Sequence, residues 1–234
     1  MTEFRPGRFE LIPAVIKNLL IANALIYFAQ NVFAHYPHFS IENTFALHDL
    51  RSVYFRPHQL VTHMFLHGSF EHIFFNMFAL WMFGSILENL WGPKRFLIFY
   101  VLCGLGAAVL HLITLYYELT PAWEMFRSLP ATDQEQFRYA ESFVINNSTV
   151  GASGAIFGCL AAFGFLFPNS LIYVYFFIPV KAKWFVLIYG AMELWLGIRN
   201  SAGDNVAHWA HLGGALVGFL LVWSWNRRNR RDFY

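Results

Sequence analysis

Charged residues are scarce in this sequence. Asp, Glu, Lys and Arg make up only 13% of its 234 residues, whereas a soluble domain usually carries about a quarter. Hydrophobic residues account for 57% and aromatic residues for 20%. This composition indicates a protein whose solvent is largely lipid. The net charge of +2 is too small to favour nucleic acid as a partner.

Cysteine is almost absent, and a cleavable signal peptide is not predicted. Cys103 and Cys159 both lie in apolar stretches, where buried cysteines usually behave as small hydrophobic residues. The first apolar run follows a polar tail and lacks the small-residue cleavage site of a secretory signal. Because we also find no transit peptide and no extra span, we expect a protein of a prokaryotic plasma membrane.

Six apolar segments approach the length of about 20 residues that a transmembrane helix needs. They run roughly over residues 18–34, 72–90, 96–117, 151–167, 183–198 and 206–225. We therefore predict an all-α membrane protein, with a bundle of six transmembrane helices over residues 18–226. The apolar stretch 171–180 is too short to span a membrane and is predicted to lie at the interface or to re-enter.

Lys and Arg are distributed unevenly about these spans, and their distribution predicts the orientation. The two tails and the second and fourth loops hold 11 of them, and the other three loops hold 5. Both termini are therefore expected in the cytoplasm. A tail of residues 1–17 precedes the bundle, and a basic tail of residues 227–234 follows it.

Two outer loops are long. The first, about residues 35–71, carries Phe, His and Leu but few charges. We expect it to be membrane-associated, since irregular backbone is tolerated there against protein. The second, residues 118–149, is acidic, and its role is open. Within it Thr132–Glu135 has the sequence of a capping box, which predicts a short amphipathic helix.

Polar groups inside membrane spans are costly, so each is a candidate functional residue. Ser153 stands between Gly151 and Gly154, where the fourth span begins. The glycines allow a tight turn and the close approach of another group. Ser153 is expected at a helix amino terminus, where free N–H groups can hold an oxyanion. A serine in a membrane span often only forms a hydrogen bond with a carbonyl oxygen of the preceding helical turn. A catalytic role for Ser153 therefore requires a second group close to it.

His211, on the sixth span, is such a group. Gly214 and Gly218 follow on its helix face, and the fourth span carries a matching stripe of small residues that begins at Gly154. Small residues at such spacings let two membrane helices pack backbone to backbone. This contact would bring Ser153 within hydrogen-bond reach of His211, the base that a serine nucleophile needs.

The second span offers donors for an oxyanion. His72 and Asn76 are four residues apart, so they share a helix face. Such a pair can hold the negative oxygen of a tetrahedral intermediate. Hydrogen bonding between helices is the alternative role for Asn76.

No acid that could orient His211 is evident. Asp204 precedes the sixth span and is a weak candidate. Glu88 and Glu193 lie in the second and fifth spans, where structural pairing is the expected role for both.

These motifs resemble those of the rhomboid family of intramembrane serine proteases, over about residues 6–225. The family's G-x-S-G motif reads Gly151-Ala-Ser153-Gly154, and its H-x-x-x-N motif reads His72-Ile-Phe-Phe-Asn76. Its A-H-x-x-G-x-x-x-G motif reads Ala210-His211-Leu-Gly-Gly214-Ala-Leu-Val-Gly218. Each motif alone is weak, but three in this order on spans two, four and six are specific.

The resemblance implies a serine endopeptidase that cleaves membrane-anchored proteins within or near their transmembrane segments. Ser153 would be the nucleophile and His211 the general base and acid, as a dyad without an acid. His72, Asn76 and the backbone N–H of Ser153 would form the oxyanion site. No metal and no cofactor are implied, and the substrate and the oligomeric state stay open.

The chain departs from the family at a few positions. The family often has Tyr four residues after the serine, stacked on the catalytic histidine, where this chain has Phe157. We therefore expect stacking without the hydroxyl's hydrogen bond. His58 stands where similar chains often carry Trp. We expect substrate to enter between the second and fifth spans, and His63, His67 and Ser69 to line a water path.

Three other functions stay open from the sequence. The main alternative is a catalytically inactive rhomboid-like protein that binds membrane helices, although such relatives typically lack the serine or the histidine. A metal enzyme could use His63 and His67, or His208 and His211, which have plausible ligand spacings. A transporter with a helix broken at Gly151 is the third alternative, although the sequence shows no paired repeats of the kind typical of that class.

Overall fold

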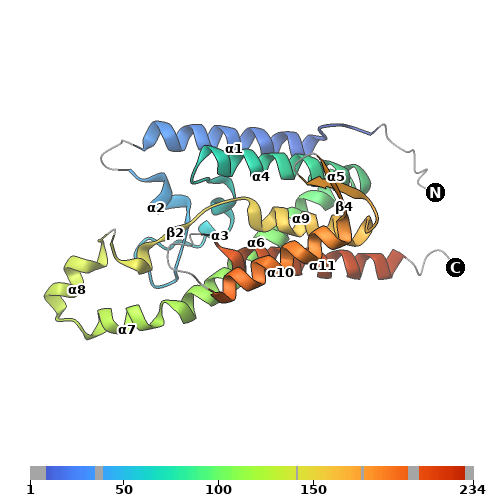
Figure 1. Cartoon of the computed structure of the whole chain (residues 1–234). Coiled ribbons are helices and arrows are strands. Elements are labelled where there is room, and N and C mark those ends of the chain that lie inside the picture. Colours follow the sequence, from blue (N-terminus) through green and yellow to red (C-terminus); the bar gives the residue numbers. More distant parts are fainter. Residues whose placement is uncertain (1–8, 35–38, 141, 175–176, 200–205, 230–234) are drawn as a thin grey trace.

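The computed structural model describes residues 9–34, 39–140, 142–174, 177–199 and 206–229. Long helices lie at all six predicted positions and form an elongated bundle (Figure 1). They are α1 (Ala14–Phe33), α4 (Phe70–Ala79) and α5 (Ser85–Trp91) joined by the π-helical segment η2 (Leu80–Gly84), α6 (Pro93–Glu118), α9 (Ser153–Leu166), α10 (Ala182–Arg199) and α11 (His208–Asn229). The predicted helical bundle is confirmed.

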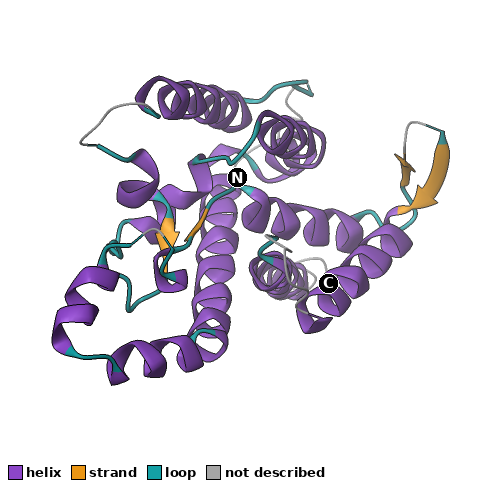
Figure 2. Ribbon diagram, turned by 60° about the vertical axis from the view of Figure 1, so that its left-hand side comes forward, coloured by secondary structure: helices purple, strands orange, loops and turns teal. Residues whose placement is uncertain are grey.

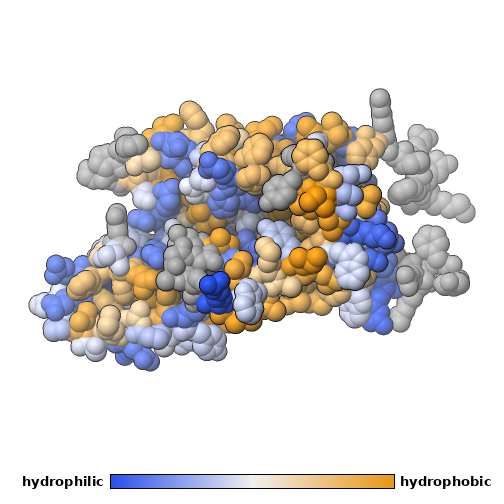
Figure 3. Space-filling model, in the orientation of Figure 1, coloured by the Kyte–Doolittle hydropathy of each residue, from blue (hydrophilic) through white to orange (hydrophobic). Residues whose placement is uncertain are grey.

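Among the described residues, three helices are long and apolar enough to cross a membrane. They are α1, α6 and the helix Phe70–Trp91, whereas α9 is apolar but has 14 residues. Large hydrophobic side chains are exposed along the bundle, and hydrophobic residues cover much of the face in Figure 3. Such a surface suits contact with lipid. The count of six spans stays a prediction.

The two ends of the bundle differ. α1 begins and α11 ends at one end, while α7 (Thr120–Ser128) and α8 (Ala131–Arg138) lie at the other (Figure 1). This arrangement agrees with an even number of crossings. The acidic loop thus holds two helices, and the predicted capping box is wrong. Pro130 is the N-cap of α8, so Thr132 already lies inside the first turn.

The apolar stretch 171–180 forms a β-hairpin. β3 (Leu171–Val174) pairs in antiparallel fashion with β4 (Ile178–Lys181), which leads directly into α10. Figure 2 shows the hairpin reaching away from the bundle. The two short strands satisfy part of their backbone hydrogen bonding by pairing with each other. A single extended segment that crossed lipid would leave these backbone groups without partners.

α9 packs against α11 backbone to backbone. A Cβ added to Gly214 would collide with the carbonyl oxygen of Gly154. A Cβ added to Gly218 would lie only 2.6 Å from the Cα of Gly158. The predicted contact between small residues of these two helices is therefore observed, and it leaves no space for a side chain at either glycine of α11.

α6 closes the third side of this core. Cys103 of α6 and Cys159 of α9 are fully buried, as predicted for small hydrophobic residues of the core, and both are free cysteines. A Cβ added to Gly106 would lie 3.0 Å from the Cβ of Val217, so α11 also approaches α6 closely. These three helices form the closely packed centre of the bundle.

Glu88 joins α5 to the start of α1. Its carboxylate oxygens accept hydrogen bonds from the backbone N–H groups of Val15 and Ile16, each at 2.8 Å. The first turn of a helix has no intrahelical partners for these groups, and its dipole favours a negative charge there. The structural role predicted for Glu88 is confirmed.

The first loop contains short elements that pack against α1 and α6. They are α2 (Ile41–Phe45), β1 (Leu47–His48), α3 (Gln59–Thr62) and the 3₁₀ turn η1 (His63–Phe65). β1 pairs with β2 (Ser148–Thr149), which follows the 3₁₀ turn η3 (Val144–Asn146). Arg51 binds Asp49 at 2.8 Å and donates to the carbonyl oxygen of Leu115, near the end of α6, at 3.1 Å. The loop is thereby tied both to the bundle and to the segment before α9.

Two histidines of the first loop are buried. Burial lowers the pKa of His63 to about 4, although the carbonyl oxygen of Gln59 accepts a hydrogen bond from its Nδ1–H at 2.8 Å. Burial, together with the neighbouring His72, lowers the pKa of His67 to about 4. Both rings are therefore neutral in the folded protein at pH 7.

We expect acid to destabilise this fold. As pH falls from about 6.5 towards 4, the unfolded chain binds protons at His63 and His67 that the folded chain does not bind. The free energy of unfolding then falls by up to about 1.4 kcal/mol per histidine per pH unit. Thermal midpoints in detergent should record this decrease, and His63→Gln should flatten it. The exposed His58 supplies the control, since His58→Gln should keep the wild-type slope. An unchanged slope in His63→Gln would contradict the assignment.

Substitution of Gly214 should separate α9 from α11. The added methyl group of Gly214→Ala would meet the carbonyl oxygen of Gly154, and overpacking of this kind costs about 1–3 kcal/mol. The thermal midpoint should fall accordingly. Gly190→Ala on α10 is the matched control, because a Cβ there has no neighbour within 4 Å. Equal midpoints for the two variants would show that the contact does not constrain the bundle.

Candidate active site

The segment that leads to Ser153 is held in a sharp turn. The N–H of Gly151 donates to the carbonyl oxygen of His63 at 2.9 Å. The φ angle of Gly151 is +132°, a conformation that residues with a side chain rarely adopt. α9 then starts at Ser153, as expected from the sequence. The backbone N–H of Ser153 is thus among those that have no partner within the helix.

Ser153 and His211 meet at the starts of two neighbouring helices. The Nε2 atom of His211 lies 2.8 Å from the Oγ atom of Ser153. The contact between Gly154 of α9 and Gly214 of α11 lies within the first turn after both residues. This close packing of the two helices holds the two side chains at hydrogen-bond distance. The ring of Phe157 stacks on the ring of His211, with centroids 4.2 Å apart and planes at 6°. The expected hydrogen-bond distance and the expected stacking are both observed.

His72 faces this pair from α4. A Cβ added to Gly151 would lie 2.9 Å from Nε2 of His72 and 3.5 Å from Oγ of Ser153, so the two atoms border the same small space. Asn76 lies one turn further along α4 and is buried. Both α4 residues line the cavity that also contains Ser153 and His211. The structure therefore brings together the four side chains that the sequence singles out.

The sequence gives no evident acid beside His211, and here the structure differs. The Oε2 atom of Glu193, on α10, lies 2.9 Å from Nδ1 of His211 and 2.7 Å from Nδ1 of His208. An acid in an otherwise apolar span is the signal that the sequence offers for Glu193. Its spacing along the chain does not say which helix it faces. Asp204, the weak candidate for this position, lies outside the described residues.

A cavity of about 940 Å³ surrounds these groups. Its walls come mainly from α4, α9 and α10, with aromatic side chains at Phe75, Phe157, Phe185 and Tyr189. Of the three residues expected on a water path, Ser69 lines this cavity, whereas His63 and His67 are buried within the first loop. The cavity thus combines apolar walls with one polar end, where Ser153 lies.

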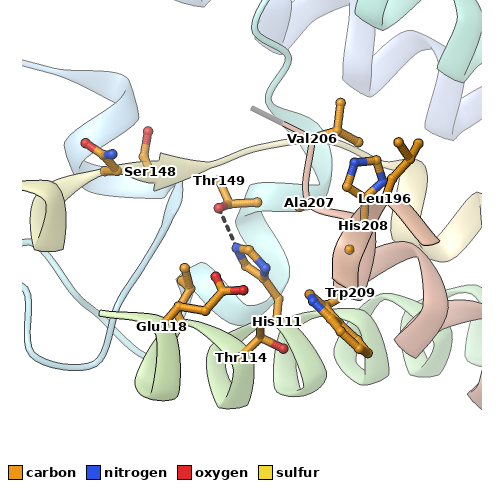
Figure 4. A pocket seen from close by; sticks show the side chains of 13 residues that line it. His111, Thr114, Glu118, Ser148, Thr149, Leu196, Val206, Ala207, His208 and Trp209 are labelled. Carbon is orange, nitrogen blue, oxygen red and sulfur yellow. Dashed lines mark hydrogen bonds between the residues drawn. The ribbon is translucent and has the colours of Figure 1, made fainter. Parts of the chain in front are cut away.

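A second cavity, of about 500 Å³, adjoins the first. Nε2 of His111 on α6 lies 2.7 Å from Oγ1 of Thr149 at its edge (Figure 4). Four residues line both cavities, namely Ser148, Thr149, Val206 and Ala207. Polar groups therefore continue from the candidate site to Glu118 at the end of α6.

One cluster among the described residues has its ligand atoms close enough together for a metal ion. It consists of Glu193, His208 and His211, whose atoms lie within 4.8 Å of one another. Carboxylate and imidazole ligands suit zinc. The same geometry is that of a carboxylate oxygen that accepts a hydrogen bond from each of two imidazole rings. No such cluster in the described part of the chain contains His63 or His67.

Comparison with known proteins gives consistent results. The family model described as "Rhomboid domain" matches residues 54–228. "RHOMBOID-like protein 12, mitochondrial" of Arabidopsis thaliana is 32% identical over 224 residues, which is 94% of this chain and 60% of that protein. "Rhomboid protein 1, mitochondrial" of Saccharomyces cerevisiae is 29% identical over 164 residues, or 68% of this chain and 39% of that protein. "Rhomboid protease AarA" of Providencia stuartii is 29% identical over 232 residues, or 92% and 74%.

These similarities bear on two expectations from the sequence. The chain spans 60% and 39% of the lengths of the plant and yeast relatives. The family match and the apolar helices together confirm an integral membrane protein. Two of the three names are mitochondrial, so they lend no support to a prokaryotic plasma membrane.

The stacking of Phe157 on His211 gives a test of how the histidine is held. An aromatic pair contributes about 0.5–1.5 kcal/mol beyond its buried area, so Phe157→Ala should slow reaction of Ser153 with a fluorophosphonate by up to about tenfold. Phe157→Tyr keeps the ring and should react at nearly the wild-type rate. Phe165→Ala is the control, because Phe165 also lies on α9 but contacts Phe219. Equal slowing by both alanine variants would mean that the stacking is irrelevant to Ser153.

Proposed function

The chain belongs to the rhomboid family, and from this premise we propose that it is an intramembrane serine endopeptidase. It cleaves membrane-anchored proteins within or near their transmembrane segments. The observation that carries the proposal is the hydrogen bond between Ser153 and His211 at the polar end of a large cavity. A serine hydroxyl is a weak nucleophile until an adjacent base accepts its proton, and His211 is placed to do so.

The positions of these atoms support the following sequence of steps. Oγ of Ser153 attacks the scissile carbonyl carbon while its proton passes to Nε2 of His211. The backbone N–H of Ser153 and the side chains of His72 and Asn76 donate hydrogen bonds to the resulting oxyanion. His211 then gives the proton to the leaving amine, and water hydrolyses the acyl-enzyme. No step calls for a metal or another cofactor.

The substrate enters between α4 and α10, where aromatic side chains line the cavity from both helices. A peptide bond within a helix is shielded by its own hydrogen bonds, so a substrate with helix-breaking residues near its end unwinds more readily into this space. Water comes from the outer side, past Ser69. Both termini lie on the opposite, cytoplasmic side, in accordance with the excess of Lys and Arg there.

Cleavage of a panel of tagged single-span proteins, co-expressed with the chain, tests the proposal. The intact chain should release a shortened product from at least one of them, and Ser153→Ala and His211→Ala should release none. Ser85→Ala is the matched control, since Ser85 is another buried serine of the bundle. It should cleave as the wild type does.

Three results would contradict the proposal. Product release that survives Ser153→Ala would place the chemistry elsewhere. Capture of membrane proteins without any cleavage, by a chain whose Ser153 does not react with a fluorophosphonate, would favour an inactive rhomboid-like binding protein. Loss of activity on treatment with a strong chelator would favour a metal enzyme.

A further inference from the structure

We infer that Glu193 is a positioning residue for His211, which makes the site a Ser–His–Glu arrangement. This inference rests on the proposed function, because it assigns Glu193 a part in the same reaction. It departs from the dyad without an acid that the motifs imply. Nothing in the motifs containing Ser153 or His211 includes Glu193, which lies 18 residues before His211 on a different helix.

The hydrogen bonds fix the tautomer of His211. An ionised carboxylate can only accept hydrogen bonds, so both Nδ1 atoms that face Oε2 of Glu193 must carry hydrogen. For His211 this leaves Nε2 with its lone pair directed at Oγ of Ser153, 2.8 Å away. The opposite tautomer would have a hydrogen on Nε2 and could not accept the proton of Ser153. Glu193 thus holds the histidine in the form that the reaction needs.

The position of Glu193 follows from the packing of α10. Gly197, one turn later on the same helix face, lets α10 approach the start of α11 closely. A Cβ added there would lie 3.2 Å from Nε1 of Trp209 and 3.3 Å from the Cβ of His208. Tyr189, one turn earlier, contacts Phe157 with ring centroids 5.0 Å apart. Along three successive turns, this face of α10 therefore lies against Phe157, against His211 and against the first residues of α11.

Charge supports the same assignment. The side chains of Glu193, His208 and His211 are only 5%, 8% and 11% exposed. A buried carboxylate is costly unless it is paired and hydrogen-bonded, and the two imidazole N–H groups supply those partners. When His211 takes the proton of Ser153, the new imidazolium lies 2.9 Å from Oε2 of Glu193. The proton stays on His211, and Glu193 remains ionised throughout.

Other groups also act on His211 and must be considered in any pH profile. Ser153 and Phe157 face it from α9, Glu193 from α10 and His208 from its own helix. His72 of α4 and His111 of α6 are near enough to interact with it electrostatically. Of all these, Glu193 is the one negative charge among the described groups around the ring. Its removal should therefore favour the neutral imidazole.

Glu193→Gln tests the inference in the purified full chain. Glutamine keeps the shape and one carbonyl acceptor but loses the charge. The rate of Ser153 modification by a fluorophosphonate should fall at least about tenfold at neutral pH, and kcat for a cleaved substrate should fall with KM nearly unchanged. The acidic limb of the pH–rate profile should move to lower pH, because the carboxylate no longer stabilises the imidazolium.

Glu88→Gln is the matched control. Glu88 is also a buried glutamate in a helix of the bundle, but it binds the backbone of α1. Its substitution should lower the thermal midpoint and leave the acidic limb in place. A purely structural Glu193 would behave in the same way as Glu88.

Three outcomes would overturn the inference. The first is a Glu193→Gln profile that coincides with the wild type. The second is an activity loss that only tracks the folded fraction. The third is a chelator that changes the wild-type rate but not that of Glu193→Gln, which would make the cluster a metal site. If the wild-type Ser153 does not react at all, the proposed function itself fails, and the inference fails with it.

Discussion

The close contact between α9 and α11 is the constraint on which the candidate site depends. Both helices have glycine where they cross. Gly214 lies against the carbonyl oxygen of Gly154, and Gly218 lies against the Cα of Gly158. Ser153 and His211 lie just beyond this crossing, at the two helix starts. A hydrogen bond of 2.8 Å between them therefore follows from the backbone packing, and no flexible loop is needed to bring them together.

The two buried glutamates of the helices have different partners, one in the bundle and one in the candidate site. Glu88 accepts hydrogen bonds from the backbone of the first turn of α1 and does not line the cavity that contains Ser153. Glu193, in contrast, accepts hydrogen bonds from two histidines at the start of α11. Both carboxylates are buried and both are paired, as the cost of a buried charge requires. The partner, rather than the burial, is what distinguishes a structural carboxylate from one that can affect catalysis.

Much of this arrangement could be predicted from the sequence. Apolar length placed the helices, and the glycine stripes identified which two of them touch. The spacing of His72 and Asn76 put both on the cavity face of α4. Three features could not be predicted. The partner of Glu193 depends on which face of α10 packs against α11. The sequence does not indicate that face, because α10 is apolar on nearly all sides and shows no periodic pattern. The hairpin of β3 and β4, and the start of α8 directly after Pro130, depend on the local backbone conformation, which an apolar or acidic composition does not specify.

The most direct measurement is an experimental structure of the chain after reaction with a fluorophosphonate. The account predicts that phosphorus is bonded to Oγ of Ser153, with the phosphoryl oxygen within hydrogen-bond distance of His72 and Asn76. His211 should still lie between Ser153 and Glu193. A phosphorus atom on any other residue, or a phosphoryl oxygen directed away from α4 with His211 displaced from Ser153, would contradict it.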